Sequence, residues 1–271
     1  MKRNIMSKQI QGKNQTPSFR RKSFDILEKT VSNIKSNKNK VVFVGISGGP
    51  ASGKSKISNY FSNNIQRSVT ICELSFFNPN EKTRNNNKDL DELIQDYDKY
   101  SKKRRLFLID KFNPNSYDFN KFSEVLTALR EGKIVKIPIF DEEKCEFNPR
   151  KEKIIDPSQT PLIIIDGYFI CTNDKIKDFL NIKIFKEVEE DDRLARLVLR
   201  EEHFLNRDKK AYEMFFKIYE KIIKTSYMDN IKDNINKSIV LPDYDINEND
   251  QLEIDETLEV ILKYLIFLSK R

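Results

Sequence analysis

The sequence predicts an α/β fold in which helices flank a parallel sheet, and three observations support this prediction. Short apolar runs alternate with stretches of helical periodicity along most of the 271 residues. One run, residues 40–47, leads into a glycine-rich loop, and together they hold four of the chain's seven glycines, Gly45, Gly48, Gly49 and Gly53. A second run, residues 162–167, ends in a carboxylate, Asp166. Alternating strands and helices favour a parallel sheet whose ligands bind at the C-terminal ends of the strands.

The glycine-rich loop follows the phosphate-binding pattern G-x-x-x-x-G-K-[ST]. Its residues are Gly48, Gly49, Pro50, Ala51, Ser52, Gly53, Lys54 and Ser55. Glycine lets backbone N–H groups approach phosphate oxygens at a helix N-terminus, where the helix dipole favours an anion. We expect Lys54 to reach the outer phosphates and Ser55 to hold Mg²⁺. The alternative is a plain turn, but the strand before the loop and a helical pattern over residues 55–66 favour a P-loop NTPase-type fold that binds ATP.

The other elements follow in chain order. Helices are predicted over residues 23–34, 119–130, 189–204, 211–228 and 252–268, and strands over residues 69–74, 133–140, 151–155, 182–185 and 238–241. The strands within residues 134–155 are expected to form a β-hairpin. Residues 78–105 are rich in Asn and Lys, so we expect a mobile surface insertion there, with a short helix near residues 90–97 and no chemistry of its own.

Composition excludes several classes of protein. The net charge of +7 arises from residues 1–40, which predicts a basic, partly disordered tail with a short helix ahead of a domain over residues 41–271. With no RNA-binding motif, we expect no specific nucleic-acid partner. No apolar run is long enough to span a membrane. Three scattered cysteines fit reduced thiols in a cytoplasmic protein, and a homo-oligomer is left open.

Two further features carry candidate chemistry. Asp166 stands at the end of its strand, where a second acidic group would meet the metal; capping the following turn is the alternative. Arg193, Arg196 and Arg200 share one helix face by their i, i+3, i+7 spacing. Such a face is either solvated or clamps a transferring phosphate, because Arg binds phosphate through two parallel hydrogen bonds.

Taken in order, these segments resemble the uridine/cytidine kinases of the phosphoribulokinase and uridine kinase group. The resemblance covers most of residues 41–245 and lies in residues 45–55, 75–77, 114–118, 129–133, 137–141, 165–167, 192–200 and 239–242. It implies ATP- and Mg²⁺-dependent transfer of the γ-phosphate to the 5′-hydroxyl of a ribonucleoside, as in pyrimidine salvage. It also implies that the hairpin covers the base and that residues 200–210 form an arginine-bearing lid.

The resemblance assigns roles to single residues. It implies that Lys54 and Arg200 are catalytic, that Arg196 and Arg207 bind ATP, and that Ser55 and Asp166 hold Mg²⁺. For the acceptor it implies contacts from Asn113, Phe140, Arg200 and Arg207.

The acceptor half departs from the family pattern. The family's catalytic Asp corresponds to Leu74, which leaves the neighbouring Glu73 as the candidate base, provided that the strand end bulges. The Asp that would hold the ribose corresponds to Phe112, and in the hairpin Phe140 and Cys145 replace a Tyr and a His. Two functions therefore remain open. One is an active kinase for a uridine- or cytidine-like nucleoside or a related small-molecule acceptor, and the other is a catalytically impaired, nucleotide-binding regulatory protein.

Overall fold

A computed structural model of the chain describes residues 25–29, 32, 41–79, 101–233, 238–243 and 256–270. Residues 25–29 are helical, as predicted for part of residues 23–34. The rest of the basic tail and the helix predicted near residues 90–97 lie outside the described residues. The division of the chain at residue 40 therefore stays a prediction.

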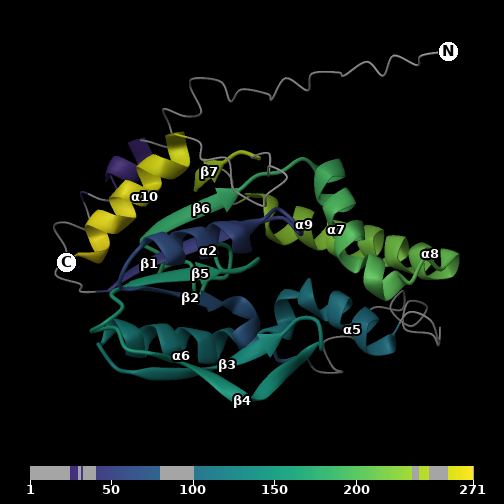
Figure 1. The fold of residues 1–271 in the computed structure, drawn as a ribbon, viewed down its shortest axis with the longest axis horizontal. Coiled ribbons are helices and arrows are strands. Elements are labelled where there is room, and N and C mark those ends of the chain that lie inside the picture. The colour runs from purple at the N-terminus through teal and green to yellow at the C-terminus, as the bar shows by residue number, and fades with distance from the viewer. Residues whose placement is uncertain are drawn as a thin grey trace.

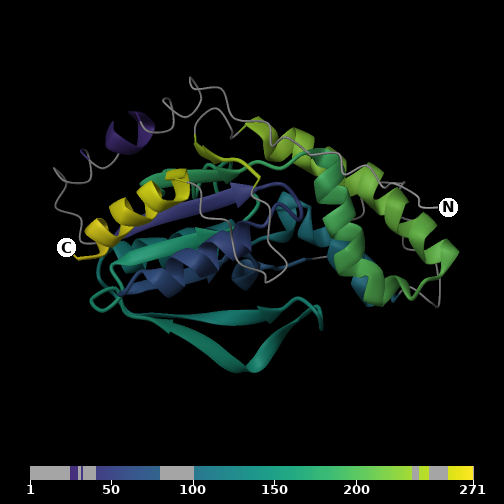
Figure 2. The same ribbon diagram turned by 45° about the horizontal axis from the view of Figure 1, so that its top comes forward.

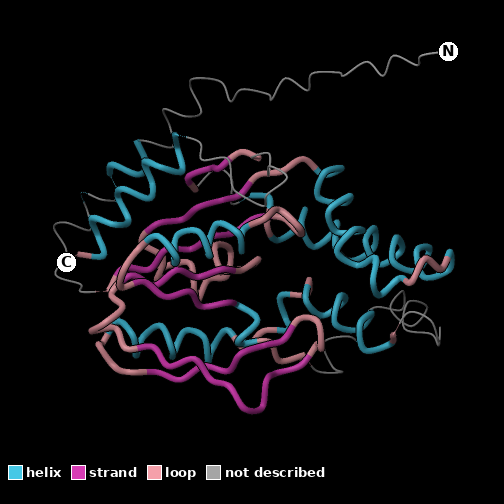
Figure 3. Tube along the Cα trace, in the orientation of Figure 1, coloured by secondary structure: helices cyan, strands magenta, loops and turns pink. Residues whose placement is uncertain are grey.

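Five parallel strands form the central sheet in the order β2-β5-β1-β6-β7 (Figures 1 and 3). The strands are β1 (Val42–Gly48), β2 (Ser68–Cys72), β5 (Leu162–Asp166), β6 (Ile182–Lys186) and β7 (Ile239–Leu241). Both β1 and β5 are buried along their whole length, which is why they read as continuous apolar runs. This sheet confirms the predicted α/β fold.

Helices cover both faces of the sheet (Figure 1). On one face, Phe43 and its neighbours pack against α6 (Phe119–Arg130). On the other face, Val44 and its neighbours pack against α2 (Lys54–Asn64) and α10 (Glu256–Ser269). Because successive strand residues point to opposite faces, one apolar run supplies both cores.

The remaining elements are a hairpin, further helices and two short turns. Strands β3 (Val135–Asp141) and β4 (Glu146–Ile155) pair as an antiparallel hairpin that Figure 2 shows apart from the central sheet. The helices are α5 (Lys102–Lys111), α7 (Glu190–Leu205), α8 (Lys209–Ile218), the π-helical η3 (Tyr219–Lys224) and α9 (Thr225–Asn230). Short 3₁₀ turns form η1 (Glu73–Phe76) and η2 (Pro114–Ser116). Among the described helices, none combines the length and the apolar character that a membrane crossing requires.

Two predictions between residues 69 and 105 are wrong. Strand β2 ends at Cys72, two residues early, because the chain turns there into η1. Residues 102–105 belong to helix α5 and not to a surface insertion. The apolar residues that follow them dock the helix into the core, and this buries Arg104 and Arg105 with them.

Candidate functional site

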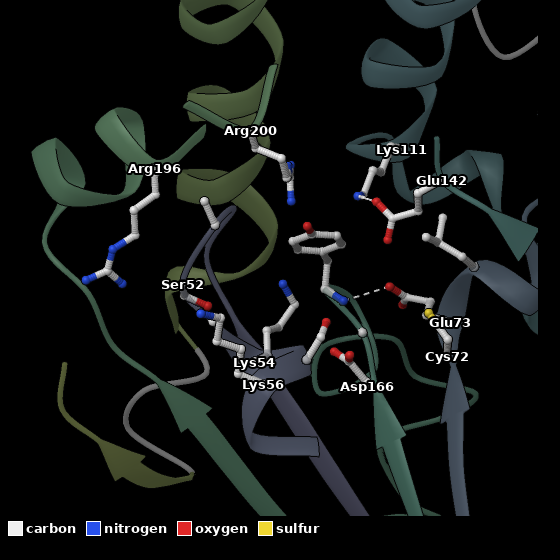
Figure 4. Close-up of a pocket in the computed structure, with 16 residues that line it drawn as sticks. Ser52, Lys54, Lys56, Cys72, Glu73, Lys111, Glu142, Asp166, Arg196 and Arg200 are labelled. Atoms are coloured by element: carbon white, nitrogen blue, oxygen red, sulfur yellow. Dashed lines mark hydrogen bonds and ion pairs between the residues drawn. The ribbon is translucent and has the colours of Figure 1, made fainter. Parts of the chain in front are cut away.

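A cavity of about 330 Å³ opens at the C-terminal ends of the central strands (Figure 4). Its walls come from the glycine-rich loop, the ends of β2 and β5, the hairpin, α5 and α7. The lining residues are Ala51, Ser52, Gly53, Lys54, Ser55, Lys56, Cys72, Glu73, Leu74, Lys111, Glu142, Asp166, Gly167, Tyr168, Arg196 and Arg200. This is where ligands bind in an open parallel sheet.

The loop backbone requires its glycines. Gly53 has φ +87°, a left-handed conformation that residues with a side chain rarely adopt. A Cβ atom on Gly48 would lie 2.6 Å from the carbonyl oxygen of Lys186, and one on Gly49 would lie 2.6 Å from the guanidinium of Arg193. The loop therefore lies closer to its surroundings than any side chain would allow.

The loop leaves polar groups available to an anion. Helix α2 begins directly after Gly53, and its first turn holds no acidic residue. The Ser52 hydroxyl is buried without a hydrogen-bond partner among the described residues. An orphaned donor beside an open helix N-terminus fits a phosphate oxygen.

Lys54 is held against an aromatic ring. Its Nζ lies 3.5 Å from the centre of the Tyr168 ring and donates to the Gly49 carbonyl over 3.5 Å. Burial would raise the pKa of Tyr168, but the charges of Lys111, Lys54 and Arg200 outweigh it and lower that pKa. Tyr168 was not predicted as a site residue, because an aromatic residue after a buried strand reads as core.

Ser55 and Asp166 meet at the floor of the cavity. The Ser55 hydroxyl lies near enough to the buried Asp166 carboxylate to influence its pKa. Burial raises the pKa of Asp166, against the opposing influence of Lys54 and Ser55. Two hard oxygen donors suit Mg²⁺, which takes its other ligands from phosphate and water. The described residues contain no cluster of three or more His, Cys, Asp or Glu that could hold a metal ion.

The predicted arginine face is divided. Arg193 turns inward, donates to the Val188 carbonyl at 3.1 Å and stacks on the Tyr227 ring, so it does not line the cavity. Arg196 and Arg200 do line it. Arg196 is also bonded to both carboxylate oxygens of Asp243, at 3.2 and 2.6 Å.

Three residues predicted to contact the acceptor are not in the cavity wall. The Asn113 side chain accepts the N–H of Asn115 at 3.0 Å and so begins η2. Phe140 stacks on Phe107 within an aromatic cluster. Arg207 is exposed in a left-handed turn after α7. The structure thus separates Asn113, Phe140 and Arg207 from the cavity that holds Lys54 and Asp166.

Glu73 lies at the cavity, where the end of β2 turns it inward. Its side chain is only 1% exposed, and its two carboxylate oxygens accept the backbone N–H groups of Tyr168, at 2.7 Å, and Phe169, at 3.1 Å. Burial raises the pKa of Glu73 to about 7, although both hydrogen bonds oppose that shift. Both oxygens therefore hold the turn after β5 in place.

An ion pair that was not predicted, with one buried and one exposed partner, stands on the same side of the cavity (Figure 4). Lys111, from the end of α5, is 2% exposed and binds the carboxylate of Glu142, from the hairpin, whose side chain is 44% exposed. Burial would raise the pKa of Glu142, but the charge of Lys111 outweighs burial and lowers that pKa to about 2. Glu142 therefore presents an ionised carboxylate to the cavity.

A second ion pair, buried at both partners, supports this wall. Arg104 binds both carboxylate oxygens of the fully buried Glu201 in α7. The same guanidinium donates to the Glu142 carbonyl at 2.7 Å and lies over the Phe204 ring. One side chain thus joins α5, the hairpin and α7, next to Arg200.

Comparison with known proteins places these features in context. A model described as the phosphoribulokinase / uridine kinase family matches residues 43–245. A uridine kinase from Ureaplasma parvum is 26% identical over 205 residues, which are 73% of this chain and 87% of that protein. Uridine kinase-like protein 3 from Arabidopsis thaliana is 28% identical over 191 residues, 69% of this chain and 36% of the plant protein. A structure solved as a candidate fructose transport system kinase from Silicibacter sp. TM1040 shares the fold, with a TM-score of 0.52, 19% identity and coverage of 82% of this chain and 96% of that one.

Proposed function

The chain belongs to the phosphoribulokinase/uridine kinase family, and from that premise we propose that it transfers the γ-phosphate of ATP to a hydroxyl group of a ribonucleoside such as uridine or cytidine, or of a related metabolite. The observation that carries this proposal is the meeting of the glycine-rich loop, Asp166 and Arg200 in one cavity. The fold and the family agree on a P-loop small-molecule kinase. We place its work in the cytoplasm, in pyrimidine salvage.

The donor side has a complete set of groups. The loop backbone and Ser52 bind phosphate oxygens, and Lys54 with Arg200 neutralises the charge that spreads over the transferring phosphate. Ser55 and Asp166 hold Mg²⁺, which supplies further charge neutralisation when bound. Because the transition state of phosphoryl transfer is loose, such positioning and charge stabilisation account for most of the catalysis.

The only support for a nucleoside as the acceptor comes from the relatives. The two curated relatives described above are named as a uridine kinase and a uridine kinase-like protein. The cavity wall near the acceptor, however, is lined by Leu74, Lys111 and Glu142. This charged wall favours a polar acceptor. The proposal therefore includes metabolites other than uridine.

A second candidate is a nucleotide-binding regulatory protein that does not transfer phosphate. It is favoured by the apolar Leu74 at the family's base position and by the backbone hydrogen bonds that engage both oxygens of Glu73. The two candidates share ATP binding and differ in turnover.

An ATP-consumption assay with Mg²⁺ separates them. The acceptors are uridine, cytidine, nicotinamide riboside, pantothenate and ribulose 5-phosphate, and Lys54→Ala is the control. We expect turnover with at least one acceptor and a loss of about two to three orders of magnitude in Lys54→Ala. Thermal stabilisation by Mg-ATP without turnover of any acceptor would instead support the regulatory protein. No stabilisation by Mg-ATP would refute both.

A further inference from the structure

Three carboxylates line the cavity, those of Glu73, Glu142 and Asp166. The proposed function gives no role to one of them. Asp166 lies against Ser55 at the presumed metal position, and Glu73 uses both oxygens to bind backbone N–H groups. Leu74, at the family's base position, has no proton acceptor. Glu142 remains, with its carboxylate partly exposed to the cavity.

We propose that Glu142 is a catalytic residue that accepts the proton of the acceptor's hydroxyl group, and that Lys111 is the positioning residue that holds its carboxylate. The inference deepens the proposed kinase function and rests on it. As the acceptor oxygen bonds to the γ-phosphorus, its O–H bond breaks and the proton passes to Glu142. The bond from the γ-phosphorus to the β,γ-bridging oxygen breaks at the same time, and ADP leaves with that electron pair.

The surroundings of Glu142 fit this role. Its side chain projects from the hairpin toward Lys111, on the opposite side of the cavity from Arg196 (Figure 4). Its backbone is fixed as well, because Arg104 donates to the Glu142 carbonyl at 2.7 Å. A carboxylate held at both its side chain and its backbone is pre-organised, which is what a proton acceptor in a positioned reaction needs.

Electrostatics favours an ionised Glu142 near the phosphates. Lys111 is the main opposite charge, and Arg200 and Lys54 also lower the pKa of Glu142. A carboxylate of low pKa is a weak base, but loose phosphoryl transfer needs little proton transfer before the transition state. The same low pKa returns the proton to water quickly, so the carboxylate is restored for the next turnover.

The first test compares Glu142→Gln with Glu143→Gln, an adjacent exposed residue of the same hairpin turn. The assay uses the full chain, Mg-ATP and the acceptor that wild type phosphorylates best. We expect kcat to fall about 100-fold in Glu142→Gln, at the gentle end for loss of a general base, with KM for ATP unchanged. Glu143→Gln should match wild type. Equal kcat values for wild type and Glu142→Gln would overturn the proposal.

The second test addresses a purely structural role, in which Glu142 only neutralises the buried Lys111. Lys111→Gln combined with Glu142→Gln removes both charges, so it should recover the thermal stability lost in Glu142→Gln alone. We expect kcat of the double variant to stay low. Recovery of kcat together with stability would overturn a catalytic Glu142 while leaving the kinase function intact. A wild-type protein that turns over no acceptor would refute the kinase function itself, and Glu142 catalysis with it.

Discussion

The Nζ atom of Lys54 lies 3.5 Å from the centre of the Tyr168 ring, so the lysine of the glycine-rich loop rests on the residue that follows β5 and Gly167. The same turn after β5 is fixed by Glu73, which accepts the backbone N–H of Tyr168. The position of the lysine therefore depends on two strands, β2 and β5, as well as on its own loop.

Replacing the ring should loosen Lys54. A cation over an aromatic face is worth about 0.5–2 kcal/mol, so Tyr168→Leu should weaken Mg-ATP binding roughly 2- to 30-fold. Tyr168→Phe keeps the ring and should bind Mg-ATP almost as wild type does. Titration calorimetry measures both. If Tyr168→Leu bound Mg-ATP as tightly as wild type, the ring would have no part in positioning the lysine.

Two glycines offer a matched pair of substitutions. Gly53 and Gly132 both have left-handed φ, +87° and +81°, and a Cβ atom on either would meet nothing within 4 Å. Gly53→Ala and Gly132→Ala should therefore each lower the free energy of unfolding by about 1–2 kcal/mol through backbone strain alone. Only Gly53→Ala should also weaken Mg-ATP binding, because Gly132 follows helix α6, away from the cavity. Urea unfolding and calorimetry on both variants check this; equal loss of Mg-ATP affinity in the two would contradict it.

Removing the charge of only one partner of the Arg104–Glu201 pair should lower the free energy of unfolding strongly. Its side chains are 6% and 0% exposed, so Glu201→Gln leaves a buried guanidinium without a counter-charge. We expect a loss of about 3–5 kcal/mol in the free energy of unfolding. Arg104→Met combined with Glu201→Leu should regain much of it, because well-packed apolar side chains often replace a buried pair without loss. Denaturant titration of the two variants measures their free energies of unfolding. If Glu201→Gln lost no more than the roughly 0–1 kcal/mol typical of exposed pairs, the pair would not be buried as described.

The lowered pKa of Glu142 should be visible in how the free energy of unfolding changes with pH. Its pKa falls from the ordinary value of 4.5 to about 2, so the folded state favours the ionised form. The stability that this supplies is fully present above about pH 4.5 and is lost as the pH falls toward 2. The difference in unfolding free energy between wild type and Glu142→Gln should therefore be largest above pH 5 and shrink steadily below it.

Comparing the two proteins at each pH cancels the contributions of other groups. Glu73 is one of these, since its pKa of about 7 acts in the opposite direction: that stability is present below pH 4.5 and is lost as the pH rises to 7. A difference between wild type and Glu142→Gln that did not change with pH would show that the Glu142 pKa is not lowered.

Local patterns predicted the strand and the helix on either side of the glycine-rich loop. The strand, loop and helix around Gly48 to Ser55 occupy one stretch of chain, so residue type and spacing determine their arrangement. Asp166 lies close to Ser55, because the ends of neighbouring parallel strands meet at one edge of a sheet, and its role at a metal stays a prediction.

The cavity wall that contains Lys111 and Glu142 depends on contacts between distant segments, which local patterns do not encode. Glu142 lies in a run of charged residues that reads as a solvated turn, and only its pairing with Lys111, 31 residues away, turns it into the cavity. Helix α5 was missed for a related reason. Its first residues, Lys102 to Arg105, resemble the polar stretch before them, and Arg104 is tolerated in the core only because Glu201, 97 residues away, neutralises it.

The single guanidinium of Arg104 holds both the Glu142 backbone and the Glu201 side chain beside Arg200. The hairpin and helix α7 are therefore joined through the side chain of one residue. If a ligand at one of these two elements changed the affinity for a ligand at the other, thermodynamic reciprocity would require the second to change the affinity for the first by the same factor. Any coupling carried by this connection would show itself as a change in the affinity of one substrate when the other is present.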